Sequence, residues 1–238
     1  MNNDKDETFI AHLEALRGVL IKCLTALALG LVPMFFAAPY LLDFLINLIS
    51  GDTHLELNFF SPMEVFVLEL KIALLADVLI CFPYMTKKVW EFVVPALYER
   101  ERKFIKSIVL SSSALFTIGV TAALVFILPM VIRFGLSFGG EAIRPVLGIG
   151  SVISLSLRLS FIFGIMFQFP LVTCALMRAG LVSYQTLAQR RRYIFIGILI
   201  LSGVLTPPDI VSQIMLGFPT YGLFELGLWF GKRHKNVW

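Results

Sequence analysis

The sequence predicts an all-α, polytopic membrane protein with six transmembrane helices, the last two short, and both termini in the cytoplasm. Of the 238 residues, 58% are hydrophobic and only 15% are charged, whereas soluble domains carry about 25% charged residues. The apolar residues form long runs, as a bilayer core about 30 Å thick demands. Lys and Arg gather between these runs on one side. We therefore expect one integral-membrane domain over residues 1–238.

Four apolar runs are long enough to cross a bilayer as single helices. They cover residues 18–38, 65–85, 108–132 and 152–177, and a span needs roughly 20 residues. The first run exceeds the apolar core of a signal peptide, about 7–15 residues, and the stretch before it is acidic. We therefore expect it to be retained as the first span.

The last apolar block, residues 194–230, is too long for one span and is interrupted by two consecutive prolines. These remove two backbone donors and stop a helix, so we expect a fifth span over 194–206 and a sixth over 210–230. The fifth is about 18 Å long at 1.5 Å per residue, shorter than the membrane core. The two helices are expected to form a hairpin whose turn lies within the depth of the bilayer.

The distribution of Lys and Arg predicts the orientation of the spans. Only Lys71, Arg133, Arg144 and Arg158 are assigned to the far side or to span ends next to it. The positive-inside rule then places both termini in the cytoplasm. The basic residues assigned to the side of the termini are Lys5, Arg17, Lys22, Lys87, Lys88, Arg100, Arg102, Lys103, Lys106, Arg178, Arg190, Arg191, Arg192, Lys232, Arg233 and Lys235.

Two loops on the far side differ in composition. Residues 39–64 mix acidic and apolar side chains in a pattern suited to helices that lie along the membrane surface. Residues 133–151 contain five glycines, and we expect this loop to be partly mobile.

The chain lacks the signatures of common enzymes. It has no HExxH, P-loop or G-x-S-x-G motif, and no expected span contains a His. Cys23, Cys81 and Cys174 lie in apolar segments without CxxC spacing, which favours reduced packing residues over a disulfide or metal site. We therefore expect no catalytic residue, no metal and no cofactor, and we attribute the net charge of +4 to topology rather than to nucleic-acid binding.

Three motifs along the chain resemble those of the TatC family, the core subunits of the twin-arginine (Sec-independent) protein translocase. They are Phe9-Ile10-Ala11-His12-Leu13 with Leu16-Arg17, Pro95-Ala96-Leu97-Tyr98 with Glu101-Arg102, and Leu205-Thr206-Pro207-Pro208-Asp209 with Ser212-Gln213. Ser61-Pro62 and Leu223-Phe224-Glu225 also fit the family pattern. The resemblance covers almost the whole chain in order, with the same number and orientation of spans.

This resemblance implies a receptor for the signal peptides of folded proteins that carry two consecutive arginines. It also implies a scaffold for single-span partners similar to TatA and TatB, with transport driven by the proton-motive force and without nucleotide. The expected location is the bacterial cytoplasmic membrane, where the chain would form a homo-oligomer within the receptor complex.

The resemblance implies where the arginine pair is bound. Arginine is a planar, permanently charged fork that pairs with carboxylates in a bidentate way, so its receptor needs carboxylates at the cytoplasmic face. Glu101 matches the family's recognition glutamate, and Glu99 is a possible helper. Basic residues flank Glu101, and such charge runs are often solvated surface, which is the structural alternative. Pro95 and Tyr98 belong to the same expected peptide-binding stretch.

The N-terminal stretch departs from the family pattern. The family's glutamate falls on Ala15 here, and Glu14 lies one residue earlier. One residue is about 100° of rotation on a helix, so Glu14 does not simply replace that glutamate. Either Glu14 reaches around the helix, or Glu101 and Glu99 carry the recognition. Peptide binding and a local structural role both stay open for His12 and Arg17.

Polar residues within the apolar segments are candidate contacts for partner helices. Many family members have a glutamate where this chain has Gln168, and glutamine cannot relay a proton. A hydrogen bond to a partner helix and plain interhelical packing are both open for it. Asp77 is a further acid within an expected span, and such acids mark function by default. The candidate partner-contact positions are Gln168, Pro207, Pro208, Asp209, Gln213 and Glu225.

A small-solute secondary transporter is the alternative reading. That class predicts inverted repeats with a broken-helix site in each half, whereas this chain has a proline-broken hairpin in one half only. A membrane enzyme is a third reading, and it lacks a nucleophile–base pair. Co-purification with single-span partners would favour export, and solute uptake by the reconstituted chain alone would favour transport.

Overall fold

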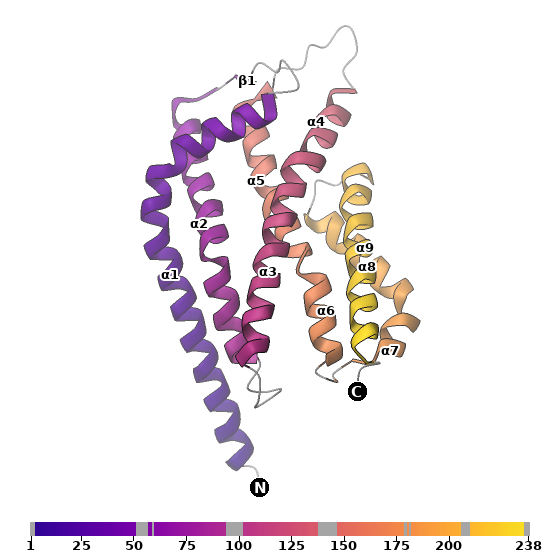
Figure 1. Cartoon of the computed structure of the whole chain (residues 1–238). Helices are drawn as coiled ribbons and strands as arrows, with labels where there is room; N and C mark the ends of the chain where they lie inside the picture. Colours follow the sequence, from indigo (N-terminus) through magenta and orange to yellow (C-terminus); the bar gives the residue numbers. More distant parts are fainter. Residues whose placement is uncertain are drawn as a thin grey trace. The chain divides into compact units, whose positions relative to one another are not determined.

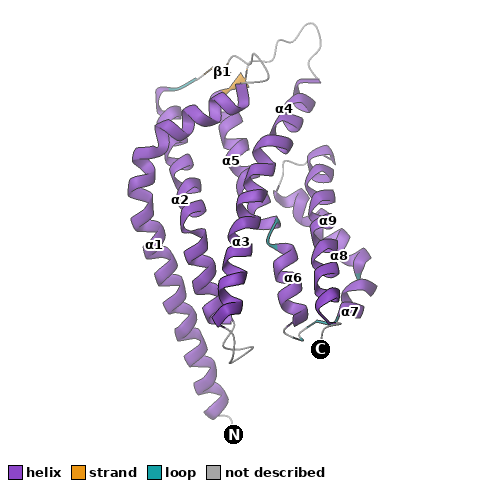
Figure 2. Cartoon of the chain, in the orientation of Figure 1, coloured by secondary structure: helices purple, strands orange, loops and turns teal. Residues whose placement is uncertain are grey.

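Helices make up nearly all of the computed structural model (Figure 2). The described residues are 3–50, 57–58, 60–93, 102–137, 147–178, 180, 182–205 and 210–235. The predicted all-α class is confirmed. The chain divides into two compact units, one of Met1–Gly51 with Ser61–Ser113 and one of Asp52–Phe60 with Ala114–Trp238.

In the first unit, α1 (Asn3–Ser50) packs along α2 (Pro62–Val93) (Figure 1). The sequence predicts a span ending at residue 38, but α1 continues as helix through Pro33 and Pro39. Past its straight portion, the C-terminal end of α1 bends away from the helix axis. A proline inside a helix removes one backbone hydrogen bond and bends the helix without necessarily ending it.

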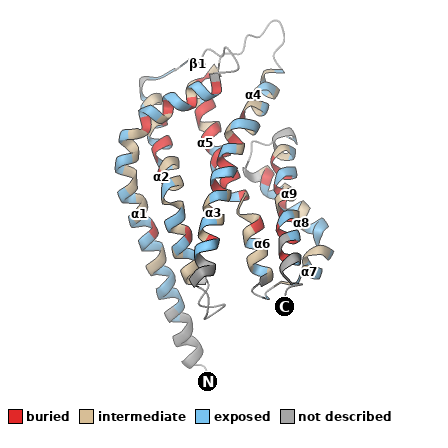
Figure 3. Ribbon diagram, viewed as in Figure 1, coloured by how far each residue is buried: buried red, intermediate tan, exposed pale blue. Residues whose placement is uncertain are grey.

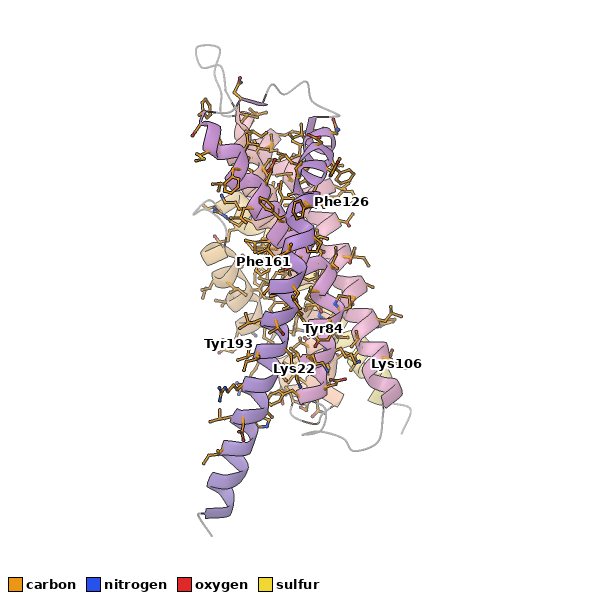
Figure 4. The ribbon with its side chains drawn as sticks, turned by 90° about the vertical axis from the view of Figure 1, so that its left-hand side faces the viewer. Lys22, Tyr84, Lys106, Phe126, Phe161 and Tyr193 are labelled. Atoms are coloured by element: carbon orange, nitrogen blue, oxygen red, sulfur yellow. The ribbon has the colours of Figure 1, made fainter. Side chains whose placement is uncertain are left out.

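The α1–α2 pair buries a narrow set of side chains and leaves a broad apolar surface exposed. Ala38 and Ala73 are fully buried, whereas Leu29, Phe36 and Tyr40 on α1 are largely exposed (Figure 3). Small residues let helices approach closely, and exposed apolar side chains suit contact with lipid. In Figure 4, where α1 faces the viewer, Lys22 of α1 and Tyr84 of α2 lie at a similar level of the pair.

A continuous helical segment leads into the second unit. It consists of α3 (Arg102–Ala122), the π-helical segment η1 (Ala123–Ile127) and α4 (Leu128–Ser137). The π segment ends two residues before Pro129, which has no N–H to donate to the preceding turn. Wider turns of this kind occur as single insertions within α-helices. Here the helix continues from the π segment into α4, which contains the proline.

Two glycines bring α3 close to α5 (Ile149–Met166). A Cβ on Gly119 would lie 2.7 Å from the carbonyl oxygen of Phe163, and a Cβ on Gly164 would lie 2.6 Å from the ring of Phe116. Both distances are too short for real contacts, so only glycine permits this approach. α5 has ten buried residues, more than any other helix that the structure describes in this unit (Figure 3).

The predicted fourth span, residues 152–177, is interrupted in the structure. α5 ends at Met166 and α6 (Phe169–Arg178) begins after a turn at Phe167 and Gln168. Pro170 explains the interruption, because its ring cannot follow an unbroken helical turn and it lacks an N–H. The apolar run alone predicts one uninterrupted helix here, and the structure shows that Pro170 ends it.

The C-terminal part contains α7 (Tyr184–Gln189), α8 (Arg191–Leu205) and α9 (Ile210–Lys235). α8 ends and α9 begins where the sequence predicts, on either side of residues 206–209, which lie outside the described residues. The short helix α7 was not predicted. Ser183 caps its N-terminus by accepting a hydrogen bond from the backbone N–H of Thr186.

A two-residue parallel pairing also lies in the second unit. β1 (Leu57–Asn58) pairs with β2 (Leu147–Gly148). The Phe60 ring covers Gly148, where a Cβ would lie 2.6 Å from it. The pairing joins two segments that lie far apart in the sequence.

Within the described part of the chain, three helical stretches are long and apolar enough to cross a membrane: His12–Ile49, Lys106–Ser137 and Ile149–Met177. α2 carries Glu69, Lys71 and Asp77 within its apolar stretch. The count of six spans stays a prediction.

Gly227 supports the packing of α9 on α6, and its substitution tests that contact. A Cβ at this position would lie 2.8 Å from Cα of Pro170 and 3.1 Å from Cβ of Thr173. Because the nearest obstacle is backbone, we expect Gly227→Ala to destabilise the protein by about 1–3 kcal/mol. The measurement is thermal unfolding in detergent. Gly222→Ala is the matched control, since nothing lies within 4 Å of a Cβ there; equal midpoints for the two variants would contradict this packing.

Candidate functional site

The N-terminal end of α1 is fastened to the C-terminal end of α2 by an aromatic contact. The rings of His12 and Phe92 are stacked, with centroids 4.4 Å apart and planes inclined by 27°. Stacked rings of this kind contribute about 0.5–1.5 kcal/mol beyond their buried area. The contact gives His12 a structural partner within the chain. It also brings the N-terminal motif beside the end of α2, the helix that precedes the second motif in the sequence.

Glu91 lies next to Phe92 and has cationic partners on its own helix. Nζ of Lys88 donates a hydrogen bond of 2.8 Å to it, and Nζ of Lys87 lies 3.8 Å away. The hydrogen bond from Lys88 is the main cause that lowers the pKa of Glu91 below its ordinary value. The same bond raises the pKa of Lys88. The pair is therefore fully charged at neutral pH, and its contribution is lost as pH falls through the lowered pKa of Glu91.

The structure describes three of the seven predicted peptide-binding residues. His12, Glu14 and Arg17 are exposed on α1. The other four lie in the sequence between the end of α2 at Val93 and the start of α3 at Arg102, outside the described residues. They are Pro95, Tyr98, Glu99 and Glu101.

Gln168 lies in the turn between α5 and α6. Its backbone N–H donates to the carbonyl of Ile165 at 2.9 Å, and its own carbonyl accepts from Val172 at 3.0 Å. The side-chain amide donates a long bond of 3.5 Å to the carbonyl of Gly164. Its polar groups thus form hydrogen bonds with backbone groups around the helix break that Pro170 causes, a local role that the sequence does not predict.

The side chain of Gln213 on α9 forms a hydrogen bond with the backbone of α8. Its side-chain amide donates a hydrogen bond of 2.9 Å to the carbonyl oxygen of Leu199, fourteen residues earlier in the sequence. Gly203 leaves room for this side chain, since a Cβ there would lie 3.1 Å from Nε2 of Gln213. The neighbouring candidates Pro207, Pro208 and Asp209 lie outside the described residues.

Glu225 forms a bidentate ion pair with Arg191. The guanidinium lies 2.9 Å from each of the two carboxylate oxygens, and the hydroxyl of Tyr221 donates a third hydrogen bond at 2.9 Å. The side chains are 43% exposed for Arg191 and 33% for Glu225. Glu225 is thus fully engaged within the chain. The sequence predicts Glu225 as a partner contact and gives Arg191 only a topological role, because nothing in the sequence pairs residues 34 positions apart.

The C-terminal helices pack around an apolar core next to this ion pair. Ile198 of α8 and Phe224 and Leu228 of α9 are buried together. The ring of Tyr221 lies edge-on to Phe195, with centroids 5.1 Å apart. Tyr221, whose hydroxyl donates to Glu225, is therefore held in place by a residue of α8 as well as by its own helix α9.

Comparison with known proteins identifies consistent relatives. Residues 11–219 match the family model described as TatC, Sec-independent protein translocase protein. The chain is 32% identical over 230 residues to the Sec-independent protein translocase protein TatC of Carboxydothermus hydrogenoformans, covering 96% of this chain and 94% of that protein. It is 29% identical to the TatC protein of Escherichia coli K12, covering 98% and 91%.

The fold also matches a solved structure. A crystal structure of the twin-arginine translocase receptor TatC in the detergent DDM superposes with a TM-score of 0.84 at 30% sequence identity. The match covers 92% of this chain and 99% of that one.

The Arg191–Glu225 pair predicts a measurable coupling. We expect Arg191→Gln and Glu225→Gln each to destabilise the protein. The destabilisation of the double variant is expected to be smaller than the sum of the two single effects by about 0.5–1 kcal/mol, since the two residues interact. A double-mutant cycle by thermal unfolding in detergent measures this. Arg190→Gln replaces the exposed neighbouring arginine as the control. Strict additivity of the two single changes would show that the pair contributes nothing.

Proposed function

The chain belongs to the TatC family of Sec-independent protein translocase proteins, and we propose that it is the receptor and scaffold of the Tat translocase. In this role it binds twin-arginine signal peptides at the cytoplasmic face of a bacterial inner membrane. Folded cargo then crosses the membrane at the expense of the proton-motive force. The observation that supports the proposal is the contact of His12 with Phe92, which joins the N-terminal motif to the end of α2, the helix that precedes the second motif in the sequence.

The acids at this end of the α1–α2 pair differ in whether a cation of the chain already binds them, and this decides which of them can bind the arginine pair of a signal peptide. Glu91 is balanced by Lys88 and Lys87, so an incoming guanidinium would have to displace a lysine. Glu14 is exposed on α1 and has the acceptor chemistry that a guanidinium needs. Together with Glu101 and Glu99, it forms the carboxylate set that we assign to the signal peptide.

Six spans with both termini in the cytoplasm are the topology that we propose. The short α8 supports the predicted hairpin, because its 15 residues extend only about 22 Å, against a core of about 30 Å. A hairpin this short leaves the bilayer locally thin or covered by protein. We propose that single-span partners similar to TatA and TatB dock there, along the positions Gln168, Pro207, Pro208, Asp209 and Gln213, and that several copies of the chain assemble in the receptor complex.

Signal-peptide binding tests the receptor role. We expect the purified protein in detergent to bind a twin-arginine peptide, and to bind it at least tenfold more weakly, about 1.4 kcal/mol, when the arginines are replaced by lysines. Lysine is a point charge without the bidentate fork, which is the reason for the difference. Glu101→Ala is expected to weaken binding of the arginine peptide to the same degree. The measurement is fluorescence anisotropy of a labelled peptide.

Glu69→Ala is the matched control for Glu101→Ala. Glu69 is an acid on α2, about 33 Å along the helix from Glu91, and its loss is expected to leave peptide affinity unchanged. Equal affinities for the arginine peptide, the lysine peptide and the Glu101→Ala variant would remove the receptor assignment.

Export and solute transport predict different companions for the chain. We expect the tagged protein, expressed in its native membrane, to co-purify with single-span proteins that carry an amphipathic helix. Proteoliposomes that contain the chain alone are expected not to accumulate small solutes when a proton gradient is applied. Gradient-driven uptake by the chain alone, without co-purifying partners, would instead support the secondary transporter.

A further inference from the structure

The end of the second unit at which α7, α8 and α9 meet carries an excess of positive charge. α7 lies beside the start of α8 and the C-terminal end of α9 (Figure 1). Residues 178–238 contain seven Lys or Arg and two acids, Asp209 and Glu225. Asp209 follows the opposite end of α8 in the sequence. Glu225 is therefore the acid of this stretch that offsets the arginines at the start of α8.

The three consecutive arginines at the start of α8 differ in what they bind. Arg191 holds the two carboxylate oxygens of Glu225 at 2.9 Å each. Arg190 and Arg192 are exposed, and no ion pair among the residues that the structure describes includes either of them. The acid at this end is thus already bound, and two guanidinium groups have no carboxylate partner in the described part of the chain.

The backbone that carries these two arginines is held in one conformation. The N–H of Arg190 donates to the carbonyls of Thr186 and Leu187, both at 3.2 Å, and its own carbonyl accepts from Ile194 at 3.1 Å. Leu187 also packs against the apolar core of α8 and α9. Because Arg190 and Arg192 are two residues apart, their Cα atoms lie no more than about 7 Å from each other. Both guanidinium groups can therefore reach the same small anion.

Lys232 of α9 adds a third cation to this end. Its Nζ lies over the ring of Tyr184 of α7, 5.4 Å from the ring centroid. A ring face attracts a cation, but it carries no negative charge that would cancel the charge of the ammonium. α7 and α9 are thus joined here without an acid, and the surroundings of the two arginines stay positive.

α8 exposes an apolar stripe directly after the arginines. Tyr193 is 76% exposed, Ile196 52% and Ile200 62%, and their spacing places them on one face of the helix. Nothing lies within 4 Å of a Cβ on Gly197, so the middle of this face is open. We call Tyr193, Ile196, Gly197 and Ile200 the apolar stripe. The opposite face of α8 buries Ile198 against α9.

We propose that this end of α8 binds one anionic phospholipid. Arg190 and Arg192 hold the phosphate of the headgroup, and an acyl chain lies along the apolar stripe. Guanidinium groups bond phosphate oxygens in a bidentate way, and Tyr side chains are enriched at the level of lipid headgroups. A phospholipid fits both features, because it joins an anion to an apolar chain as α8 joins the arginines to the stripe. The inference rests on the proposed topology, which places this end at the cytoplasmic membrane surface.

Native mass spectrometry of the full-length, delipidated protein in detergent measures this binding. We expect phosphatidylglycerol, which is anionic, to bind at least tenfold more tightly than phosphatidylcholine with the same acyl chains, whose headgroup carries its own cation. The double variant Arg190→Gln/Arg192→Gln is expected to bind phosphatidylglycerol at least tenfold more weakly than the wild type. Arg133→Gln is the matched control, since it removes the same charge from an exposed position on α4 and is expected to leave the affinity unchanged.

A soluble headgroup distinguishes a lipid from a free phosphate compound. Glycerol 3-phosphate has the phosphate but no acyl chain, and we expect it not to displace phosphatidylglycerol at equal concentration. Equal displacement would show that the apolar stripe contributes nothing, and it would replace the lipid site by a phosphate site. Unchanged affinity of the double variant, or an equal loss in Arg133→Gln, would also overturn the proposal and leave the arginines with a topological role alone.

Signal-peptide binding keeps this site separate from the proposed receptor. The double variant is expected to bind the twin-arginine peptide with the affinity of the wild type, because the acids assigned to the peptide belong to α1 and to the stretch between α2 and α3. Failure of the wild type to bind the peptide would count against the receptor. It would leave the lipid result as it is, since binding in detergent does not depend on the peptide or on the orientation of the spans.

Discussion

Satisfaction of backbone hydrogen bonds in an apolar solvent is the constraint on which this structure depends. Lipid offers no partner to an N–H or C=O group, so a chain of this composition forms helices throughout. Prolines are the points at which the constraint needs a local solution. Before Pro129 the helix widens into a π segment, and before Pro170 it breaks at Gln168, whose amide and backbone groups bond around the gap.

Close approach between helices is the second theme of the structure. Helices in lipid gain little from the hydrophobic effect and associate through packing and hydrogen bonds. Glycines provide the space where such contacts occur: Gly119 and Gly164 between α3 and α5, Gly227 between α6 and α9, and Gly30 beside the acid of α2. Each lies against backbone or a bulky side chain that a methyl group would displace.

Two of the acids that the structure describes are balanced by cations of the same chain. Glu91 is neutralised by neighbouring lysines at the end of α2, and Glu225 is held by Arg191 and Tyr221. These internal ion pairs reduce the number of acids that can bind an arginine-bearing ligand. Asp77 is different in kind, since it is buried in the interior of the α1–α2 pair and is bonded to a thiol.

The sequence by itself determined the helical class, the helix ends that flank residues 206–209 and the family, because apolar runs, charged loops and local motifs are properties of neighbouring residues. It predicted the interruption around Pro207 and Pro208 but not the break at Gln168, since a single proline bends or breaks a helix according to its surroundings. Only the tertiary structure decided the stacking of His12 on Phe92, the pairing of Arg191 with Glu225 and the enclosure of Asp77 by Gly30. Each joins residues distant in the sequence, and the rotation of one helix against another selects which side chains meet.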